Sequence, residues 1–309
     1  MRDEILSDLV ADEDDLRARA FRRLRERIYG RHPLHRPAEG YVGTVRRLRR
    51  AHAVAFHDRW YSPARTVLAI AGDLDPKDAA RLAKQHFGRW RAGAREQPAA
   101  PAIPQSSSWS ARVQVPREQV HIALGHIGIR RADPDYHALL VLDHVLGTGP
   151  GFTDRISKKI RDELGLTYGV SANITASAGR EPGIFAAYLS TEPKNAKLAC
   201  ESLVAELRRV IASPPSVEEV RTAKDYSMGS YPFALERNSH RAHALIQMER
   251  HQLGADHVEK FPRRIAAVTA ADVARRARPS QTQRSRRRDS GSLPDGVPPL
   301  GVPPNWGPA

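Results

Sequence analysis

The segment GLTYGVSANITASAGREPGIFAAYLST (165–191) decides the fold, because it carries two strand patterns separated by a turn. Residues 166–178 and 183–190 are short, mainly apolar runs, and Gly and Pro lie between them. An amphipathic run, FTDRISKKIRDELG (152–165), precedes the first strand and ends at Gly165, a residue type that commonly stops a helix. The stretch therefore predicts a helix followed by two strands.

The neighbouring sequence extends this pattern in both directions. ARVQVPREQVHIALGHIGI (111–129) alternates as strands do, and DPDYHALLVLDHVLG (133–147) is typical of a helix that begins at Asp-Pro and ends at Gly. Further helical patterns cover 193–211, 216–230, 234–253 and 269–277. Together they predict an α+β layer fold, with helices packed on one face of a largely antiparallel sheet.

Residues 2–92 form another block, which contains several helical patterns but a single strand pattern. Helical patterns cover 2–28, 43–60 and 76–90, whereas TVLAIAGDL (66–74) is the one convincing strand, and its pattern is that of a buried strand. A single apolar strand cannot satisfy its own backbone groups and needs neighbouring strands. We therefore expect another chain, or residues upstream of Met1, to supply the missing strands.

Composition divides the chain into two domains, a linker and a tail. We predict an incomplete first domain at 1–92, a linker rich in Ala, Pro and Ser at 93–110, a second domain at 111–277 and a disordered basic tail at 278–309. Helical periodicity stops abruptly after Arg275, so we favour a frameshift that replaced the natural terminus. A basic arm that grips an acidic partner is the alternative.

The chain has 309 residues and a formal net charge of +14, and so basic a composition favours a nucleic-acid partner. Residues 275–309 hold seven Arg and two Asp and contribute 7 − 2 = +5 of this charge. No nucleic-acid motif occurs, so solvated arginines on helix faces are the favoured interpretation. The lone Cys200 excludes an internal disulfide and is expected to be buried.

No run of 18 apolar residues is present, so we expect no membrane-spanning helix. Met1 is followed by acidic residues and not by a basic and then apolar leader, so no signal peptide is visible. The default location is the cytoplasm.

The order of motifs resembles the pitrilysin/insulinase-type zinc metallopeptidases, or inverzincins, which include processing-peptidase subunits. In the first block the resemblance is carried by ILSDLVADEDDLRARAFRRLRERIYGRHPLHRPAEG, FHDRWYSPARTVLAIAGDLDP and QHFGRW. In the second it is carried by IALGHIGIRRADPDYHALLVLDHVLG, FTDRISKKIRDELGLTYGV and AGREPGIFAAYLST. It covers about residues 2–276 and implies the end of a zinc-type domain followed by a non-zinc peptidase-like domain.

The resemblance implies peptide-bond hydrolysis at a zinc site that this sequence does not complete. The family binds Zn²⁺ through His-x-x-Glu-His and a later carboxylate, and neither this motif nor His-Glu-x-x-His occurs here. Asp8 of ILSDL stands at the third-ligand position, where the family usually has the longer Glu. We expect the chain alone to hold no zinc and to be inactive, and a solvated helix carboxylate is the simpler interpretation of Asp8.

Three further groups contain side chains that metals favour: His32 with His35, His52 with His57, and Glu236 with His240 and His243. The first group lies in a Pro-containing loop, and the second points to two faces of a helix. The third shares one helix face and could hold a metal, although an ordinary helix is favoured. GTGPGF (147–152) lacks the Lys-Ser/Thr of a phosphate loop and is predicted to end a helix.

Arg161 and Tyr168 lie seven residues apart, on either side of Gly165. The resemblance implies that both contact the carbonyl groups of a bound peptide near the scissile bond. A phenol and a guanidinium can donate to the oxygen that becomes negative during attack on the carbonyl. A surface arginine and a tyrosine packed at a strand end are the structural alternative.

Three hypotheses follow for the function of the chain. The first is a clipped zinc endopeptidase, inactive alone, which acts on peptides. The second is a non-catalytic subunit that supplies Arg161 and Tyr168 to a homologous zinc-bearing chain. The third, of a different class, is a basic nucleic-acid-binding protein, whose binding would weaken steeply with salt.

Overall fold

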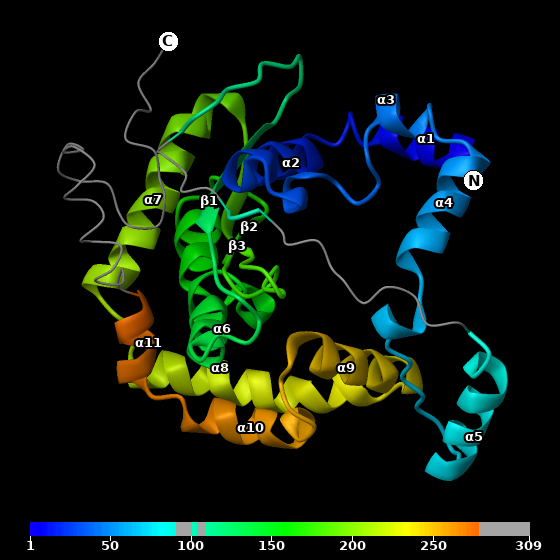
Figure 1. Ribbon diagram of the computed structural model, residues 1–309. Helices are drawn as coiled ribbons and strands as arrows, with labels where there is room; N and C mark the ends of the chain where they lie inside the picture. The colour runs from blue at the N-terminus through cyan, green and yellow to red at the C-terminus, as the bar shows by residue number, and fades with distance from the viewer. Residues whose placement is uncertain (91–100, 104–108, 278–309) are drawn as a thin grey trace.

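The computed structural model describes residues 1–90, 101–103 and 109–277, and Figure 1 draws the remainder as a thin grey trace. The predicted tail at 278–309 and most of the predicted linker at 93–110 lie outside the described residues. Among the helices of the described ranges, none is both long and apolar enough to cross a bilayer.

A three-stranded antiparallel sheet forms the centre of the second block. It contains β1 (Val120–Ile127), β2 (Val170–Asn173) and β3 (Ile184–Thr191), in the order β1-β3-β2. Both neighbours of β3 run antiparallel to it, with Val120 opposite Thr191 and Val170 opposite Leu189. The predicted α+β fold with an antiparallel sheet is confirmed.

Helices α6 (Tyr136–Leu146) and α7 (Ala196–Ala212) pack against one face of the sheet. Helices α8 (Val217–Ser230), α10 (His257–Ala267) and α11 (Ala270–Ala277) pack on α6 and complete the main core. Smaller or peripheral elements are η3 (Pro150–Phe152), η4 (Ser157–Glu163), η5 (Pro193–Asn195), η6 (Tyr231–Leu235) and α9 (Asn238–His251). Leu189, Leu203 and Ile265 are fully buried in this core, and their burial is the main stabilising contribution.

Helix α10 is an element that the sequence patterns did not predict. It contains Pro262 in its interior, a residue that normally interrupts a helix. Phe261 and Ile265, on either side of the proline, are buried against the other helices of the core. Packing of this apolar face outweighs the cost of the proline.

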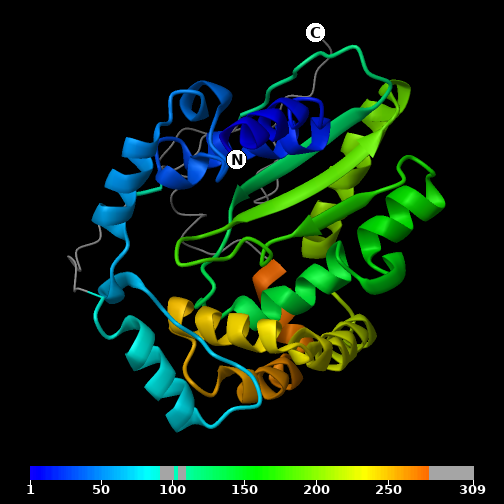
Figure 2. The ribbon, with the colours of Figure 1, turned by 90° about the vertical axis from the view of Figure 1, so that its right-hand side faces the viewer.

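The other face of the sheet is covered by α2 (Leu16–Tyr29), so the prediction of helices on one face only is wrong. Leu24 and Ile28 pack against Ile184 of β3. A side chain at Gly125 of β1 would collide with the β3 backbone and lie 3.0 Å from the Leu24 side chain, so glycine is required for this close approach. Figure 2 shows α2 lying across the strands. The sheet is therefore enclosed on both faces.

The predicted helix at 2–28 is divided into α1 (Arg2–Ala11) and α2. A turn at 12–14 separates them, and the Asp15 carboxylate accepts hydrogen bonds from the backbone of Arg17 (2.8 Å) and Ala18 (3.0 Å) at the start of α2. The predicted helix at 43–60 is likewise two pieces, α3 (Val42–Val45) and α4 (Arg50–Trp60). Two turns, η1 (Pro33–His35) and η2 (Pro63–Arg65), complete this part of the chain.

The prediction of a buried strand at 66–74 is wrong in this structure. The segment has no strand partner among the described residues, and the side chains of Val67 (45%), Leu68 (52%) and Ile70 (41%) are exposed. It lies between α4 and α5 (Pro76–Phe87), and Figure 1 shows these helices standing apart from the sheet. We call residues 50–87 the α4–α5 arm. The strand pattern is present, but the described part of the chain offers no sheet to receive it.

Asp143 of α6 fixes the end of β2. Its carboxylate accepts hydrogen bonds from the backbone N–H of Ile174 (2.8 Å) and Thr175 (2.9 Å) and from the Thr175 hydroxyl (2.5 Å). Burial raises the pKa of Asp143 to about 6, although these three donors favour the ionised form. At pH 7.5 the carboxylate is therefore ionised and fully hydrogen-bonded.

We predict that Asp143→Ala lowers the free energy of unfolding by about 2–5 kcal/mol, because it leaves three donors in the interior without an acceptor. Urea denaturation at pH 7.5 measures this. The control is Asp225→Ala on α8, whose side chain is 60% exposed. Equal unfolding free energies for the two variants would contradict the role given to Asp143.

Candidate functional site

The candidate site lies on residues 150–170, which lead from η3 through a helical segment to β2. The segment begins at Asp154, whose carboxylate accepts hydrogen bonds from the Ser157 backbone N–H (2.8 Å) and the Ser157 hydroxyl (2.9 Å). Both residues are buried, and burial raises the pKa of Asp154. This cap fixes where the helix that carries Arg161 begins.

The helix itself is a π-helix over Ser157–Glu163, whereas the sequence predicts an ordinary helix. Its wider spacing is visible at the C-terminal end, where the Leu164 N–H donates to the carbonyl of Lys159 (3.1 Å), five residues earlier. Short π-helical turns are uncommon and occur frequently at functional sites. The sequence contains no signal from which this change in spacing could have been predicted.

Arg155 ties the start of the same helix to the loop between α7 and α8. Its guanidinium donates to both oxygens of Glu219 (2.6 and 2.7 Å) and to the backbone carbonyls of Ser213 (2.7 Å) and Pro214 (3.3 Å). The hydrogen bond from Arg155 lowers the pKa of Glu219 to about 2. This bidentate ion pair between Arg155 and Glu219 holds the helix that carries Arg161 against the core.

Arg161 lies with its guanidinium over the ring of Phe152, 3.8 Å from the ring centroid. This cation–π contact positions the charged group, while the Asp162 carboxylate lies 3.8 Å away. Phe152 has φ = 61°, a left-handed conformation that is unusual for a large side chain. The side chain of Arg161 remains 35% exposed, so its donors are accessible to a ligand.

Tyr168 is 90% exposed, although the backbone on both sides of it is firmly held. The Thr167 hydroxyl lies 2.9 Å from the Gly169 carbonyl oxygen and 2.5 Å from that of Ser190. The Leu166 N–H donates to the carbonyl of Ile160 (3.0 Å), and the Leu166 carbonyl accepts from Thr191 (2.6 Å). An anchored backbone thus presents a free phenol to solvent.

Gly165 ends the helix with φ = 61°, which confirms the predicted break between Arg161 and Tyr168. The hydrogen bonds and ring contacts of the described residues include none between Arg161 and Tyr168. The structure therefore presents two accessible donors on one short segment, and they do not pair with each other. Phe152, Asp154, Arg155 and Thr167, which support them, were missed by the sequence analysis.

Asp8, predicted at the third-ligand position of a zinc site, is an exposed residue of α1. Within the described ranges, no group of three or more His, Cys, Asp or Glu side chains is placed to hold a metal ion. Zn²⁺ needs three or four such donors at about 2.0–2.3 Å. The residues present here therefore do not fit a zinc site.

The other histidine groups have structural roles or no metal geometry. His32 Nδ1 accepts from the Leu34 N–H (3.2 Å) at the start of η1, and the His32 carbonyl oxygen lies 2.8 Å from His35 Nδ1. His52 Nδ1 accepts from the Arg49 N–H (3.3 Å) at the start of α4. Each of these imidazoles closes a turn of its own backbone.

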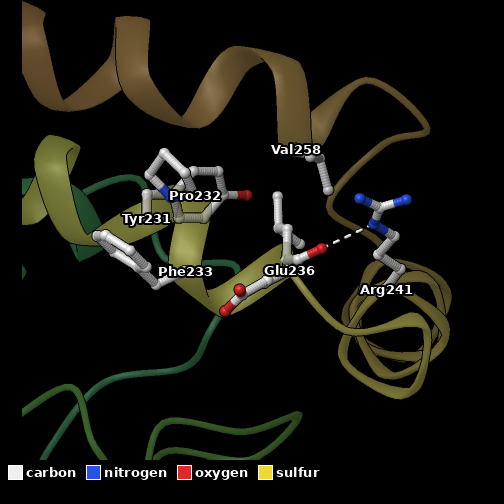
Figure 3. Close-up of a pocket in the computed structure, with 7 residues that line it drawn as sticks. Tyr231, Pro232, Phe233, Glu236, Arg241 and Val258 are labelled. Atoms are coloured by element: carbon white, nitrogen blue, oxygen red, sulfur yellow. Dashed lines mark hydrogen bonds between the residues drawn. The ribbon is translucent and has the colours of Figure 1, made fainter.

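The predicted shared face of Glu236, His240 and His243 is wrong, because α9 begins only at Asn238. Glu236 instead lines a shallow apolar pocket with Tyr231, Phe233 and Val258, shown in Figure 3. In that view its carboxylate points away from Arg241, which donates to the Leu235 carbonyl (2.7 Å). The three candidate ligands therefore do not converge.

The glycine-rich stretch at 147–152 ends α6, as the sequence predicts. Gly147 packs against Ala172 of β2 so closely that a Cβ would collide with its backbone. Cys200 is buried, and burial raises the pKa of its thiol to about 11, so it is an unreactive core residue.

We predict that Glu219→Gln lowers the free energy of unfolding by about 1–2 kcal/mol at pH 7, a figure reduced for partial exposure to solvent. The folded-state pKa of Glu219, about 2, lies below its ordinary value of 4.5, so the ion pair stabilises the fold above pH 4.5 and its contribution is lost between about pH 4.5 and 2. Urea denaturation of both proteins across this range measures the difference. A difference that does not shrink with acid would contradict the ion-pair explanation.

Comparisons with known proteins identify the family. The sequence profile of the peptidase M16 inactive domain matches residues 47–226. An uncharacterised zinc protease of Mycobacterium tuberculosis strain H37Rv is 28% identical over 279 residues, which are 88% of this chain and 62% of the relative. Subunit 1 of the mitochondrial cytochrome b-c1 complex of Bos taurus is 30% identical over 150 residues, 47% of this chain and 31% of that protein.

Among solved structures, the crystal structure of a peptidase M16 inactive domain from Pseudomonas fluorescens superposes with a TM-score of 0.79 at 26% identity. The superposition covers 89% of this chain and 65% of that one. The chain thus spans a little over 60% of the length of the M. tuberculosis relative. The match to the peptidase M16 inactive-domain profile, over residues 47–226, covers more than half of the sequence, and the chain belongs to the peptidase M16 family.

Proposed function

We propose that this chain is the peptide-contacting part of a zinc peptidase whose zinc is held by polypeptide outside this sequence. That polypeptide is either the remainder of a longer chain or a separate, homologous zinc-bearing subunit. Membership of the M16 family supports a role in proteolysis. The lack of a zinc motif in the sequence supports an active site that is divided between this chain and a second, zinc-bearing polypeptide.

The observation that carries the proposal is the exposure of Tyr168. Large aromatic side chains are usually at least half-buried, and the residues on either side of Tyr168 are held by hydrogen bonds. A 90% exposed phenol on such a backbone is positioned in advance for a ligand and loses little freedom when it binds. Arg161, restrained by Phe152, supplies a second donor on the same segment.

These two donors suit the carbonyl chemistry of peptide hydrolysis. Attack on a peptide carbonyl places negative charge on its oxygen, and donors that are already oriented stabilise that charge more than they stabilise the bound substrate. Zinc, when bound by the other polypeptide, would activate water for the attack. In this chain, Tyr168 and Arg161 would hold the peptide and its carbonyl oxygens.

The α4–α5 arm supports docking of a second polypeptide. Residues 66–70 have no regular secondary structure, include the exposed apolar side chains of Val67, Leu68 and Ile70, and have no strand partner among the described residues. Leu82 and Phe87 of α5 are also exposed, at 40% and 51%. A sheet contributed by the zinc-bearing polypeptide would satisfy the backbone of 66–70 and bury these side chains.

The nucleic-acid alternative is not favoured. Several arginines of the basic helices are paired with acidic residues, such as Arg22 with Glu13 (2.6 Å) and Arg221 with Glu218 (2.6 Å). Others lie over aromatic rings, such as Arg17 over the ring of Tyr188. The positive charge is thus distributed over helix faces, and the family comparison points to proteolysis.

We predict that the purified chain alone cleaves no unstructured peptide and binds less than stoichiometric zinc, because three zinc donors do not converge in its described ranges. A quenched fluorogenic peptide library and mass-spectrometric metal analysis measure both. Chelator-sensitive cleavage by the chain alone, abolished by Asp8→Ala, would overturn the division of the site between two polypeptides.

We further predict that adding the part of the M. tuberculosis zinc protease that this chain does not match, by co-expression or fusion, produces cleavage that depends on Tyr168. Tyr168→Phe should lower kcat by about 10²–10³-fold, because one carbonyl donor is lost. Tyr226→Phe, a matched change on α8, should leave kcat unchanged. Backbone hydrogen exchange of residues 66–70 should slow in the assembly.

The outcomes separate the two parts of this proposal. Slower exchange at 66–70 with full activity of Tyr168→Phe would retain the docking role and reject the tyrosine as a catalytic donor. Unchanged exchange at 66–70 in an active assembly would reject the docking site.

A further inference from the structure

A second cavity, of about 500 Å³, lies between the start of α6 and helices α10 and α11. We call it the Arg131 cavity. Its lining includes Arg131, which follows β1, His137 of α6, and His257 and Arg264 of α10. Its other charged lining residues are Asp133, Asp135, Asp272 and Arg275. Neither the sequence motifs nor the family match assigns it a role.

His257 lies between two guanidinium groups. Arg131 Nη2 is 3.3 Å from His257 Nε2, and Arg264 Nη1 is 3.1 Å from His257 Nδ1. A neutral imidazole has one nitrogen that accepts and one that donates, and a guanidinium can only donate. In one of the two contacts, an arginine N–H therefore faces the N–H of the imidazole. Neither of these two donors has an acceptor in that contact.

Two further polar atoms of the cavity lack partners. Arg131 Nη1 and His137 Nε2 are both buried and have no hydrogen bond within the described ranges. A buried guanidinium or imidazole nitrogen without a hydrogen-bond partner destabilises the fold, because it has lost its contact with water and gained none in the protein. Two unpaired groups beside the mispaired His257 indicate that an acceptor belongs in this space.

The nearby carboxylates do not supply that acceptor. Asp135 pairs with Arg276 (2.5 Å), Asp272 pairs with Arg275 (2.8 Å), and Asp256 pairs with Lys260. In the part of the chain that the structure describes, neither Arg131 nor Arg264 has an ion pair with a carboxylate. Arg131 instead stacks on the Tyr136 ring, 3.7 Å from its centroid. Asp133 also lines the cavity, and its carboxylate accepts from the Asp135 N–H (2.9 Å). The guanidinium groups of Arg131 and Arg264 are therefore without a direct carboxylate partner in the described residues, although three carboxylates line the same cavity.

The electrostatics of the two histidines agree with this excess of positive charge. Burial, and then the charges of Arg131 and Arg264, lower the pKa of His257 to about 4 and that of His137 to about 4. Asp256 acts in the opposite direction on His257 but does not offset the two arginines. Both imidazoles are thus neutral at pH 7.

We propose that the Arg131 cavity binds a phosphate-class oxyanion, held by Arg131 and Arg264 with His257 and His137 beside it. A tetrahedral dianion presents acceptor oxygens in several directions, so it can accept from donors on both sides of the His257 ring. A carboxylate has its two oxygens in one plane and fits a single guanidinium fork better. The proposal is independent of the proposed peptidase function.

Isothermal titration calorimetry of the full chain with inorganic phosphate and with sulfate tests the site. Wild type should bind both anions, and Arg131→Gln or Arg264→Gln should weaken binding at least about tenfold, because each removes a charge-assisted hydrogen bond. Arg221→Gln, which removes an arginine paired on α8, should bind as wild type does. Equal binding by all four proteins would show general attraction to a basic chain and would overturn the proposal.

Histidine NMR titration of wild type supplies a second measurement that does not require the arginine variants to fold. Sulfate should raise the pKa of His257 by about 1–3 units, because an anion at this distance favours the imidazolium. The His257 signal is identified by its loss in His257→Gln. No change in the His257 titration at saturating sulfate would also overturn the proposal.

A third arm identifies the source of the anion. Glycerol phosphate that binds more tightly than inorganic phosphate would assign the cavity to a phosphomonoester, and the reverse order would assign it to the free ion.

Discussion

Strand β3 is the constraint on which the rest of the structure depends. It has a hydrogen-bonded neighbour on each edge, the main helical core on one face and α2 on the other. At its C-terminal end, the Ser190 carbonyl accepts a hydrogen bond from the Thr167 hydroxyl, and the Thr191 hydroxyl donates one to the Leu166 carbonyl. The backbone that presents Tyr168 is therefore hydrogen-bonded on its N-terminal side to β3, the most buried of the three described strands.

The sequence was sufficient for the central architecture of residues 111–277, and the reason is local. The strand patterns at 166–178 and 183–190 are short apolar runs bounded by Gly and Pro. The apolar pattern and the bounding residues therefore both indicate strands. Features that arise from tertiary packing were not predictable. Helix α10 forms despite Pro262 because Phe261 and Ile265 are buried, and α2 covers the second face of the sheet because Gly125 leaves room for Leu24.

Residues 66–74 show how a correct local pattern can give a wrong element. VLAIA has the composition of a buried strand, but a strand exists only when another strand accepts its hydrogen bonds. The same pattern analysis that predicted the strand also required neighbours for it, and that requirement remains unmet in the described residues. The exposed side chains of the segment are the physical consequence.

The candidate site was predictable in its residues but not in its geometry. Arg161, Gly165 and Tyr168 were identified from the sequence, whereas the π-helix, the Phe152 ring and the Thr167 anchor were not. A strand-like segment without a strand partner in the described residues and an exposed tyrosine on a hydrogen-bonded backbone lie in different blocks of the chain. Under the proposed function they have one cause, since a zinc-bearing polypeptide that supplied the missing sheet would also bring its zinc, and the substrate carbonyl beside it, to Tyr168. A chain that folded around its own complete site would have needed neither exposed feature.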